Sequence, residues 1–219
     1  MGEGRLTSAQ VEVLRALAGI VPAWRLAGGA ALAGFYTRHR GTRDLDLFWL
    51  GKDLAQLDVE ILRRLAAAGF AGQVLQRDPA FCRLRVVRGA DVVVVDLVAD
   101  PVPAVADPAE HALGDVRILV DPPQEILVAK LCALLSRSEL RDLEDVRALL
   151  DAGGDLVRAM ADAPRKDAGY SPVTLAWVLE HLPIAAMGRA LARTADEIRG
   201  LEDFRQKLVG EILAAAKPD

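Results

Sequence analysis

Three aspartates have the residue type and spacing that could support catalysis. Asp44 and Asp46 are separated by one leucine in the run DLDLFWL, whose period of two predicts a β-strand over residues 44–50. Alternate side chains on a strand share a face, so both carboxylates would point the same way, about 7 Å apart along the backbone. Two unpartnered carboxylates repel each other, and a divalent cation removes that repulsion. The pair therefore predicts a site for Mg²⁺ (or Mn²⁺), which prefers oxygen ligands and often binds substrate phosphates as well.

Asp96 is the expected third carboxylate of this site. It follows the apolar run at residues 92–95, which is typical of a central strand, where a charge is rarely tolerated without a reason. A third carboxylate would allow two cations about 3.5–4 Å apart, which stabilise the attacking and leaving oxygens of an in-line displacement at phosphorus. We therefore expect Asp44, Asp46 and Asp96 to be metal ligands and catalytic residues, with Asp96 helping to remove the proton of the acceptor hydroxyl.

A diglycine supplies the second half of a phosphoryl-transfer site. Gly28 and Gly29 follow a short predicted strand at residues 23–27 and precede an alanine-rich predicted helix at residues 30–36. Glycines let backbone N–H groups come close to an anion, and the positive end of the following helix points at the same place. We expect the two glycines to hold the triphosphate of a nucleotide, with Arg43 neutralising charge on the leaving pyrophosphate.

Several other catalytic classes lack the residues that they require. The sequence has no GxxxxGK[ST] phosphate loop, no GxGxxG between a strand and a helix, and no GxSxG nucleophile motif. Its three histidines, His39, His111 and His181, are scattered, and each is expected to be a surface or packing residue. Cys82 and Cys132 stand far apart without a CxxC pattern, which argues against a zinc knuckle and a disulfide scaffold.

Composition narrows the class of protein. The 219 residues include 27 basic and 31 acidic side chains, so the net charge of −4 gives no global attraction to nucleic acid. The hydrophobic fraction of 52% and the charged fraction of 26% are typical of a globular protein with a sizeable core. No stretch approaches the roughly 18 uncharged apolar residues of a membrane helix, and no apolar signal core follows the N-terminus. We therefore expect a cytoplasmic protein with no membrane partner.

The remaining pattern predicts the elements that position these residues. Residues 7–10 (TSAQ) form a capping box for a helix over residues 8–18, and leucines at helical spacing predict another helix from Leu54 to near Gly69. Two β-branched runs, residues 81–87 and 91–98, flank a glycine turn and predict a hairpin, and residues 116–120 would add an edge strand. From residue 124 onward the pattern is helical, with residues 164–172 separating later helices. An α+β fold follows, with an α/β domain at residues 1–122 and a helical domain at residues 123–219.

Two sets of motifs resemble a known family. Residues 26–32 (LAGGAAL) and 43–48 (RDLDLF) resemble the opening motif of the nucleotidyltransferase superfamily with the DNA polymerase β-like fold. Residues 116–120 (VRILV), 126–135 (ILVAKLCALL) and 141–145 (RDLED) are similar to the AbiEii/AbiGii-type nucleotidyltransferases, the toxin component of abortive-infection toxin–antitoxin pairs. The resemblance covers roughly residues 24–150. It implies a nucleotidyltransferase domain with a mixed sheet flanked by helices, followed by an all-helical C-terminal part.

The resemblance also implies roles for particular residues. Its opening motif is associated with metal binding at the DxD pair, while the third carboxylate varies in this branch. Its second motif is associated with nucleotide binding and activity, which carries over to Lys130, Arg141, Asp142 and Asp145. From the residues alone, Arg141 and Asp145 have the i, i+4 spacing of a surface ion pair, and Lys130 flanks a leucine stripe along which its stem could extend. A structural role for this second motif therefore stays open.

The expected activity is Mg²⁺-dependent transfer of a nucleoside monophosphate from an NTP to an acceptor. RNA, such as tRNA, is the favoured acceptor, and an antitoxin protein is an expected partner. A local basic patch of Arg38, His39, Arg40 and Arg43, which Arg83 and other arginines would extend, could attract RNA although the net charge does not. Two alternatives remain: a non-catalytic nucleotidyltransferase-like module that binds a nucleotide or a partner protein, and a nucleotidyltransferase for small molecules of the aminoglycoside type.

Overall fold

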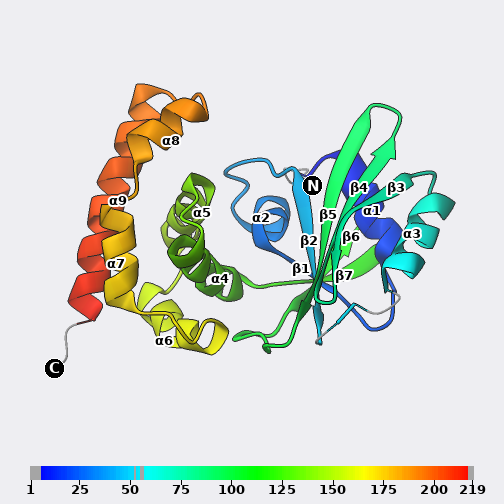
Figure 1. Ribbon diagram of the computed structural model, residues 1–219, viewed down its shortest axis with the longest axis horizontal. Coiled ribbons are helices and arrows are strands. Elements are labelled where there is room, and N and C mark those ends of the chain that lie inside the picture. The colour runs from blue at the N-terminus through cyan, green and yellow to red at the C-terminus, as the bar shows by residue number, and fades with distance from the viewer. Residues whose placement is uncertain (1–5, 52, 55–56, 217–219) are drawn as a thin grey trace. The chain divides into compact units, whose positions relative to one another are not determined.

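The computed structural model describes residues 6–51, 53–54 and 57–216 (Figure 1). Contacts within the chain divide it into two units, Met1–Pro122 and Pro123–Asp219. The first unit combines a mixed β-sheet with helices, and the described part of the second unit is helical. The predicted α+β fold is therefore confirmed.

A sheet of seven strands, counted over the described residues, forms the centre of the first unit. The strand order is β3-β4-β5-β2-β1-β7-β6. The pairs β1–β7 and β2–β5 are parallel, and the other neighbouring pairs are antiparallel. The strands are β1 (Arg25–Ala27), β2 (Asp44–Leu50), β3 (Ala71–Asp78), β4 (Phe81–Arg88), β5 (Asp91–Asp100), β6 (Ala109–Leu113) and β7 (Val116–Val120).

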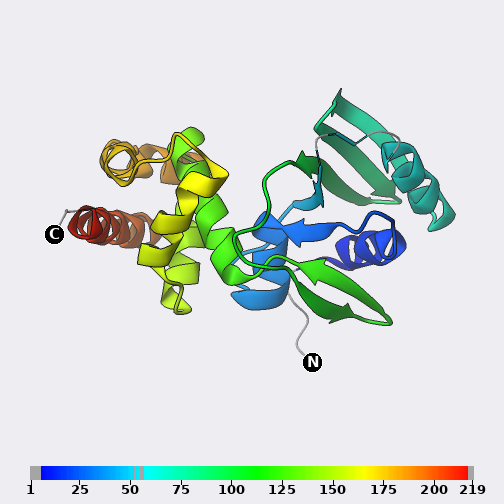
Figure 2. The same cartoon turned by 90° about the horizontal axis from the view of Figure 1, so that it is seen from below.

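Helices cover both faces of this sheet. Helices α1 (Ser8–Leu17) and α3 (Leu57–Ala67) lie on one side, and α2 (Gly28–Ala31), which continues into the π-helix η1 (Leu32–Tyr36), lies on the other (Figures 1 and 2). The predicted capping box of α1 is present, because Thr7 Oγ1 accepts a hydrogen bond of 3.2 Å from Gln10 N and Gln10 Oε1 accepts one of 2.8 Å from Thr7 N.

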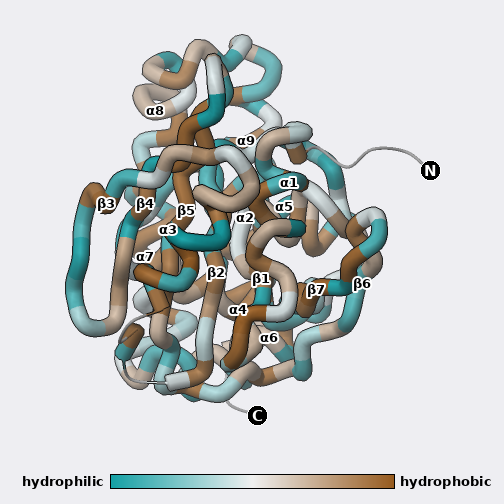
Figure 3. The backbone as a smooth tube through the Cα atoms, turned by 90° about the vertical axis from the view of Figure 1, so that its right-hand side faces the viewer, coloured by the Kyte–Doolittle hydropathy of each residue, from teal (hydrophilic) through white to brown (hydrophobic). Residues whose placement is uncertain are grey.

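The apolar core of the first unit lies on the α1 side of the sheet. Leu45, Leu47 and Trp49 of β2 alternate with partly exposed residues and are buried, as are Leu14 and Leu17 of α1. The central strand β5 is hydrophobic along most of its length, whereas much of β3 and its connection to β4 are hydrophilic (Figure 3). Burial of one face of β2 therefore fixes which residues of that strand remain on the other face.

Some predicted elements of the first unit differ from the observed ones. The sequence predicts no strand over residues 71–78, because its apolar residues do not alternate there. In the structure these residues form β3, and their side chains are mostly exposed. The prediction that residues 116–120 form an edge strand is wrong, because β6 pairs with the outer side of β7. The sequence of β6, AEHAL, has few β-forming residues. The helix expected after the diglycine begins at Gly28 itself. The expected helix start near Leu54 includes residues 55–56, which lie outside the described residues, as does the N-terminal segment 1–5.

The second unit is built from helices joined by short connections. Helix α4 packs against α5, α6 and α7, and α7 packs against α9. The expected separation of two helices by residues 164–172 is present, although the first helix continues through Pro164 to Lys166, and the side chain of Ser171 caps the next helix. Among the described residues, no helix has both the length and the apolar character needed to span a membrane. The helices are α4 (Pro123–Ser136), α5 (Leu140–Asp151), α6 (Leu156–Lys166), α7 (Pro172–Glu180), α8 (Ile184–Ala190) and α9 (Ala195–Ala215).

Candidate functional site

Asp44 and Asp46 lie on the same face of β2. Both carboxylates are partly exposed, whereas Leu45 and Leu47 point to the opposite face and are fully buried. The hydroxyl of Thr42, in the turn that precedes the strand, donates a hydrogen bond of 2.9 Å to Asp44 Oδ1. The strand therefore presents two carboxylates on one face that solvent can reach, as its period of two predicts.

A row of facing residues crosses the sheet at Asp46. Asp46 lies opposite Ala27 of β1 on one side and opposite Asp96 of β5 on the other. Asp96 in turn lies opposite Arg83 of β4. Directly opposed residues on neighbouring strands have their side chains on the same face of a sheet. The register therefore brings Asp96, although distant in the sequence, to the face that carries the DxD pair.

Gly28 lies against Asp46 at the start of α2. Its φ of +60° is in the left-handed region, and a Cβ placed on it would overlap Asp46 Oδ2. The first N–H groups of a helix have no intrahelical acceptor, and the helix dipole makes this end positive. Glycine is therefore required here for both its backbone conformation and its size, and it brings free backbone donors beside a carboxylate of the DxD pair.

Gly29 makes room for the basic turn that follows η1. A Cβ on Gly29 would be 2.9 Å from Arg40 Nη2 and 3.4 Å from Thr42 Oγ1. Gln10 Nε2 donates a hydrogen bond of 3.1 Å to the carbonyl of Thr42, which ties the turn to α1. Arg40 is thereby held at the diglycine, and Arg43, next to Asp44 in the chain, is exposed.

Asp96 is engaged by an arginine that the sequence analysis assigned only to an extended RNA patch. Arg83 Nε donates a hydrogen bond of 2.7 Å to Asp96 Oδ1, and Arg83 Nη2 donates one of 2.6 Å to Asp96 Oδ2. Asp96 is 5% exposed, and the side chain of Arg83 is 43% exposed. The hydrogen bond from Arg83 to Asp96 raises the pKa of Arg83 despite partial desolvation, and the charges of Asp96, Asp44 and Asp46 add to that increase.

The three aspartates do not form a ready-made set of three ligands. Within the described residues, no group of three or more histidine, cysteine or acidic side chains is arranged to hold a metal ion. Asp44 and Asp46 are the exposed oxygen donors on this face, whereas both oxygens of Asp96 bind Arg83. The residues that fit a divalent cation are therefore the two carboxylates of the DxD pair. Proteins often bind Mg²⁺ through one or two carboxylates, while water and substrate phosphates provide the other ligands.

A second ion cluster, which sequence reasoning missed, supports the same face of the sheet. Arg25 of β1 is buried, its Nη2 donates a hydrogen bond of 2.9 Å to Asp100 Oδ2, and its Nε lies 2.9 Å from Asp121 Oδ1. Its guanidinium carbon is 5.3 Å from the centre of the Phe48 ring. Arg25 thus joins the ends of β5 and β7 to β1. No sequence motif identifies it, because the cluster depends on which strands become neighbours.

The motif residues of the second unit form their own buried cluster. Lys130 Nζ lies 2.8 Å from Asp142 Oδ1 and 2.7 Å from Asp145 Oδ2. Arg137 also binds Asp142, with Nε 2.7 Å from Oδ2 and Nη2 2.8 Å from Oδ1. Burial opposes ionisation of Asp142, but Arg137 and Lys130 outweigh it and lower the pKa of that carboxyl. Arg141 points elsewhere, since its Nε donates a hydrogen bond of 2.6 Å to Glu139 Oε2.

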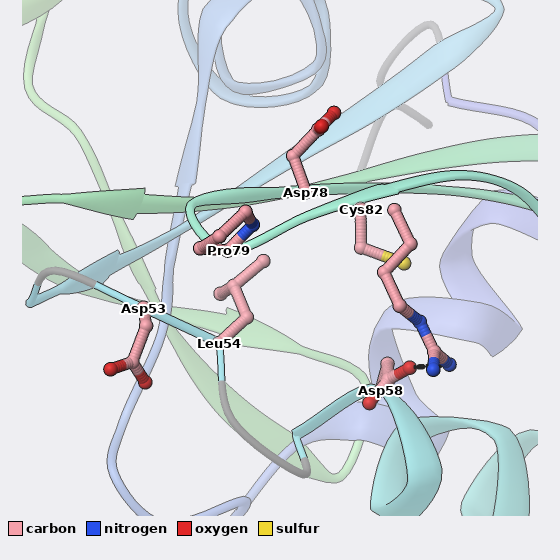
Figure 4. Close-up of a pocket in the computed structure, with 7 residues that line it drawn as sticks. Asp53, Leu54, Asp58, Asp78, Pro79 and Cys82 are labelled. Carbon is pink, nitrogen blue, oxygen red and sulfur yellow. Dashed lines mark hydrogen bonds and ion pairs between the residues drawn. The ribbon is translucent and has the colours of Figure 1, made fainter.

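A cavity of about 500 Å³ in the first unit lies apart from the DxD pair (Figure 4). Its lining includes Asp53, Asp58, Arg77 and Cys82, and Arg77 forms an ion pair with Asp58. Cys82 is buried beside Arg83 in the chain and therefore points to the opposite face of β4. Burial, followed by the charge of Asp58, raises the pKa of the Cys82 thiol. Cys82 and the facing Arg77 therefore lie on the face of the sheet opposite to the one that carries Asp44 and Asp46.

Comparison with protein families gives a match over nearly the whole chain. The model of the nucleotidyltransferase AbiEii toxin family, described as belonging to type IV toxin–antitoxin systems, matches residues 12–216. No curated protein sequence matches the chain significantly.

Solved structures with the same fold include two bacterial proteins. MenT4, the nucleotidyltransferase toxin Rv2826c of Mycobacterium tuberculosis H37Rv, is 18% identical with a TM-score of 0.59, and the match covers 95% of this chain and 91% of MenT4. JHP933 of Helicobacter pylori is 17% identical with a TM-score of 0.57, and the match covers 96% of this chain and 94% of JHP933. At these identities the comparisons establish similarity of fold over both units.

Proposed function

Because the chain belongs to the AbiEii family of nucleotidyltransferase toxins, we propose that it transfers a nucleoside monophosphate from an NTP to RNA, with tRNA as the favoured acceptor. The observation that carries the proposal is the contact between the diglycine and the DxD pair. Gly28 begins a helix directly against Asp46, and Asp44 shares that carboxylate's face of β2. Free backbone donors and two carboxylates in contact are what a nucleotide triphosphate with its divalent cation requires.

Asp44 and Asp46 would hold Mg²⁺ (or Mn²⁺) in this proposal. Both are oxygen donors on one accessible face, and Thr42 fixes the orientation of Asp44 by its hydrogen bond to Oδ1. When bound, the cation would neutralise charge on the phosphates and polarise the phosphorus centre that the acceptor attacks. The two carboxylates orient the triphosphate relative to the helix end at Gly28, and such positioning accounts for much of the rate in phosphoryl transfer.

Positive groups around the diglycine would bind the phosphate chain. The start of α2 at Gly28 lies against Asp46, and the Arg40 guanidinium lies beside Gly29. Arg43 is exposed next to Asp44 and would contact the leaving pyrophosphate. Arg38 and His39 belong to the same turn and would extend the positive surface toward an RNA acceptor.

In this proposal the cluster of the second unit supports the activity indirectly, by holding α4 and α5 together. Lys130, Asp142 and Asp145 are buried and bound to one another, so their first role is to fix α4 against α5. Arg141 has a side chain that is 47% exposed, and its ion pair with Glu139 lies outside this cluster. The motif thus combines buried residues that position the two helices with one arginine at the surface.

Label transfer tests the proposal directly. The purified chain is incubated with each α-labelled NTP, Mg²⁺ and total RNA, and the labelled product is identified after separation by size. We expect label in RNA, and we expect Asp44→Asn combined with Asp46→Asn to abolish it. Asp91→Asn is the matched control, because Asp91 is exposed at the start of β5, outside the part of β5 that pairs with β2, and it should keep the activity.

The same assay separates the alternatives. Label in a small molecule of the aminoglycoside type, with none in RNA, would indicate the small-molecule nucleotidyltransferase. Failure to bind any NTP in the presence of Mg²⁺ would indicate a non-catalytic module. Expression in a host with and without the genes that flank this one then tests for toxicity and for an antitoxin partner.

The thiols of Cys82 and Cys132 are both free, which agrees with our proposal that the protein acts in the reducing cytoplasm.

A further inference from the structure

Arg83 and Asp96 form a closed ion pair beside the DxD pair. The guanidinium donates one hydrogen bond to each oxygen of the carboxylate, at 2.7 and 2.6 Å. Such a two-bond fork is among the strongest side-chain pairings, and it engages both oxygens of the carboxylate. Because Asp96 is nearly buried, its oxygens have little access to any other partner from solvent.

Charge balance on this face supports the same conclusion. Arg83 neutralises Asp96, so Asp96 adds no net negative charge beside Asp44 and Asp46 on the neighbouring strand. If Asp96 were a ligand as well, three carboxylates would meet beside an unpaired guanidinium, and the positive charge of Arg83 would repel the cation.

We propose that Arg83 is a positioning residue that keeps Asp96 out of the coordination shell, so that the site takes a single divalent cation at Asp44 and Asp46. This inference rests on the proposed function and replaces the expectation of a two-cation site with Asp96 as third ligand. Arg83 and Asp96 act together as one neutral group of the sheet.

Titration of the full chain with Mn²⁺, followed by the electron paramagnetic resonance signal of the free ion, tests this inference. The wild type should bind one Mn²⁺. Arg83→Gln removes a unit charge and releases a carboxylate, so it should tighten Mn²⁺ binding about tenfold. Removing the whole pair with Arg83→Gln combined with Asp96→Asn should return the affinity to within about twofold of the wild type, since neither residue would be a ligand.

Arg85→Gln is the matched control for charge. Arg85 lies two residues along β4 on the same face, and it opposes Val94 instead of an acid. Its loss should change the Mn²⁺ affinity by no more than about threefold, because it removes one exposed, screened charge without releasing a carboxylate. Circular dichroism verifies that each variant is folded. If Arg83→Gln alone does not fold, because Asp96 is left buried without its partner, the double variant decides the question.

Three results would overturn the inference while leaving the proposed function standing. The first is a wild-type stoichiometry of two Mn²⁺, and the second is a loss of affinity of tenfold or more in the double variant, which would make Asp96 a ligand. The third is an unchanged affinity in a folded Arg83→Gln variant. Failure of the proposed function gives a different result. Asp46→Asn would then bind Mn²⁺ as tightly as the wild type does, and the inference would be refuted together with the proposed function.

Discussion

Replacing Gly28 by alanine tests the contact on which the site depends. Gly28 has a φ of +60°, and a Cβ at this position would overlap Asp46 Oδ2. An alanine in the left-handed region costs about 1–2 kcal/mol. Asp46 cannot move as a whole, because its strand lies in the middle of the sheet, so its side chain must leave its rotamer at a further cost of about 0.5–1.5 kcal/mol. We expect a total loss of about 1.5–3.5 kcal/mol in the free energy of unfolding.

Urea unfolding measures this loss in the first unit. Trp24 and Trp49 are both buried there, so their fluorescence reports the unfolding of the sheet. Gly89→Ala is the matched control, because Gly89 has a φ of +59° and no atom within 4 Å of an added Cβ. It should lose the backbone part alone, about 1–2 kcal/mol. The difference between the two variants isolates the effect of the overlap with Asp46.

Mn²⁺ affinity supplies the functional half of the same experiment. Gly28→Ala displaces a carboxylate of the DxD pair, so it should weaken Mn²⁺ binding tenfold or more, whereas Gly89→Ala should leave it unchanged. Equal losses of stability in the two variants, together with wild-type Mn²⁺ affinity in both, would refute the contact between Gly28 and Asp46. The interpretation of the diglycine as part of the site would then fail.

Three further outcomes are expected. Lys130→Met should lower the free energy of unfolding by about 3–5 kcal/mol, because it leaves buried carboxylates without their cation. The control Lys207→Met, at a side chain that is 72% exposed, should change the free energy of unfolding by less than about 0.5 kcal/mol. Thermal unfolding measures both changes. Gly29→Ala should displace the flexible Arg40 guanidinium and weaken NTP binding several-fold with little change in melting temperature, as a fluorescent-nucleotide titration would show. The depressed pKa of Asp142 stabilises the fold above its ordinary value of 3.8 and loses that effect as the pH falls through the folded pKa, so Asp142→Asn should flatten the acid limb of a stability–pH curve.

The parts of the site that are close in the sequence could be predicted from it. The alternation in residues 44–50 fixes the shared face of Asp44 and Asp46, because a strand with one buried face has a single register. The order of strand, diglycine, helix and strand also predicts the neighbourhood of Gly28 and Asp46. These relations depend on short-range geometry, and the structure agrees with them.

Partners from distant strands were harder to predict, for two different reasons. The opposition of Arg83 and Asp96 is present in the sequence as a signal: a two-residue turn at Gly89 and Ala90 pairs Arg88 with Asp91, and counting back along both strands reaches Arg83 and Asp96. The predicted strands at residues 81–87 and 91–98 leave Arg88 in the turn, and with that assignment the pairing of Arg83 with Asp96 is missed. The contacts of Arg25 have no such signal, because they depend on β1 lying between β2 and β7, and hydrophobic patterning does not specify which strands become neighbours.

Access to solvent assigns different roles to the two acidic motifs. A cation or a nucleotide can bind a carboxylate only where water can be displaced from it, and Asp44 and Asp46 are partly exposed on their face of β2. Asp142 and Asp145 have no exposed surface, and their charges are already balanced by Lys130 and Arg137. Replacing one partner of such a buried cluster destabilises the protein strongly even when no ligand is involved. Loss of activity in a Lys130 or Asp142 variant therefore identifies a nucleotide contact only when the variant retains its stability, whereas loss in an Asp46 variant can be interpreted directly.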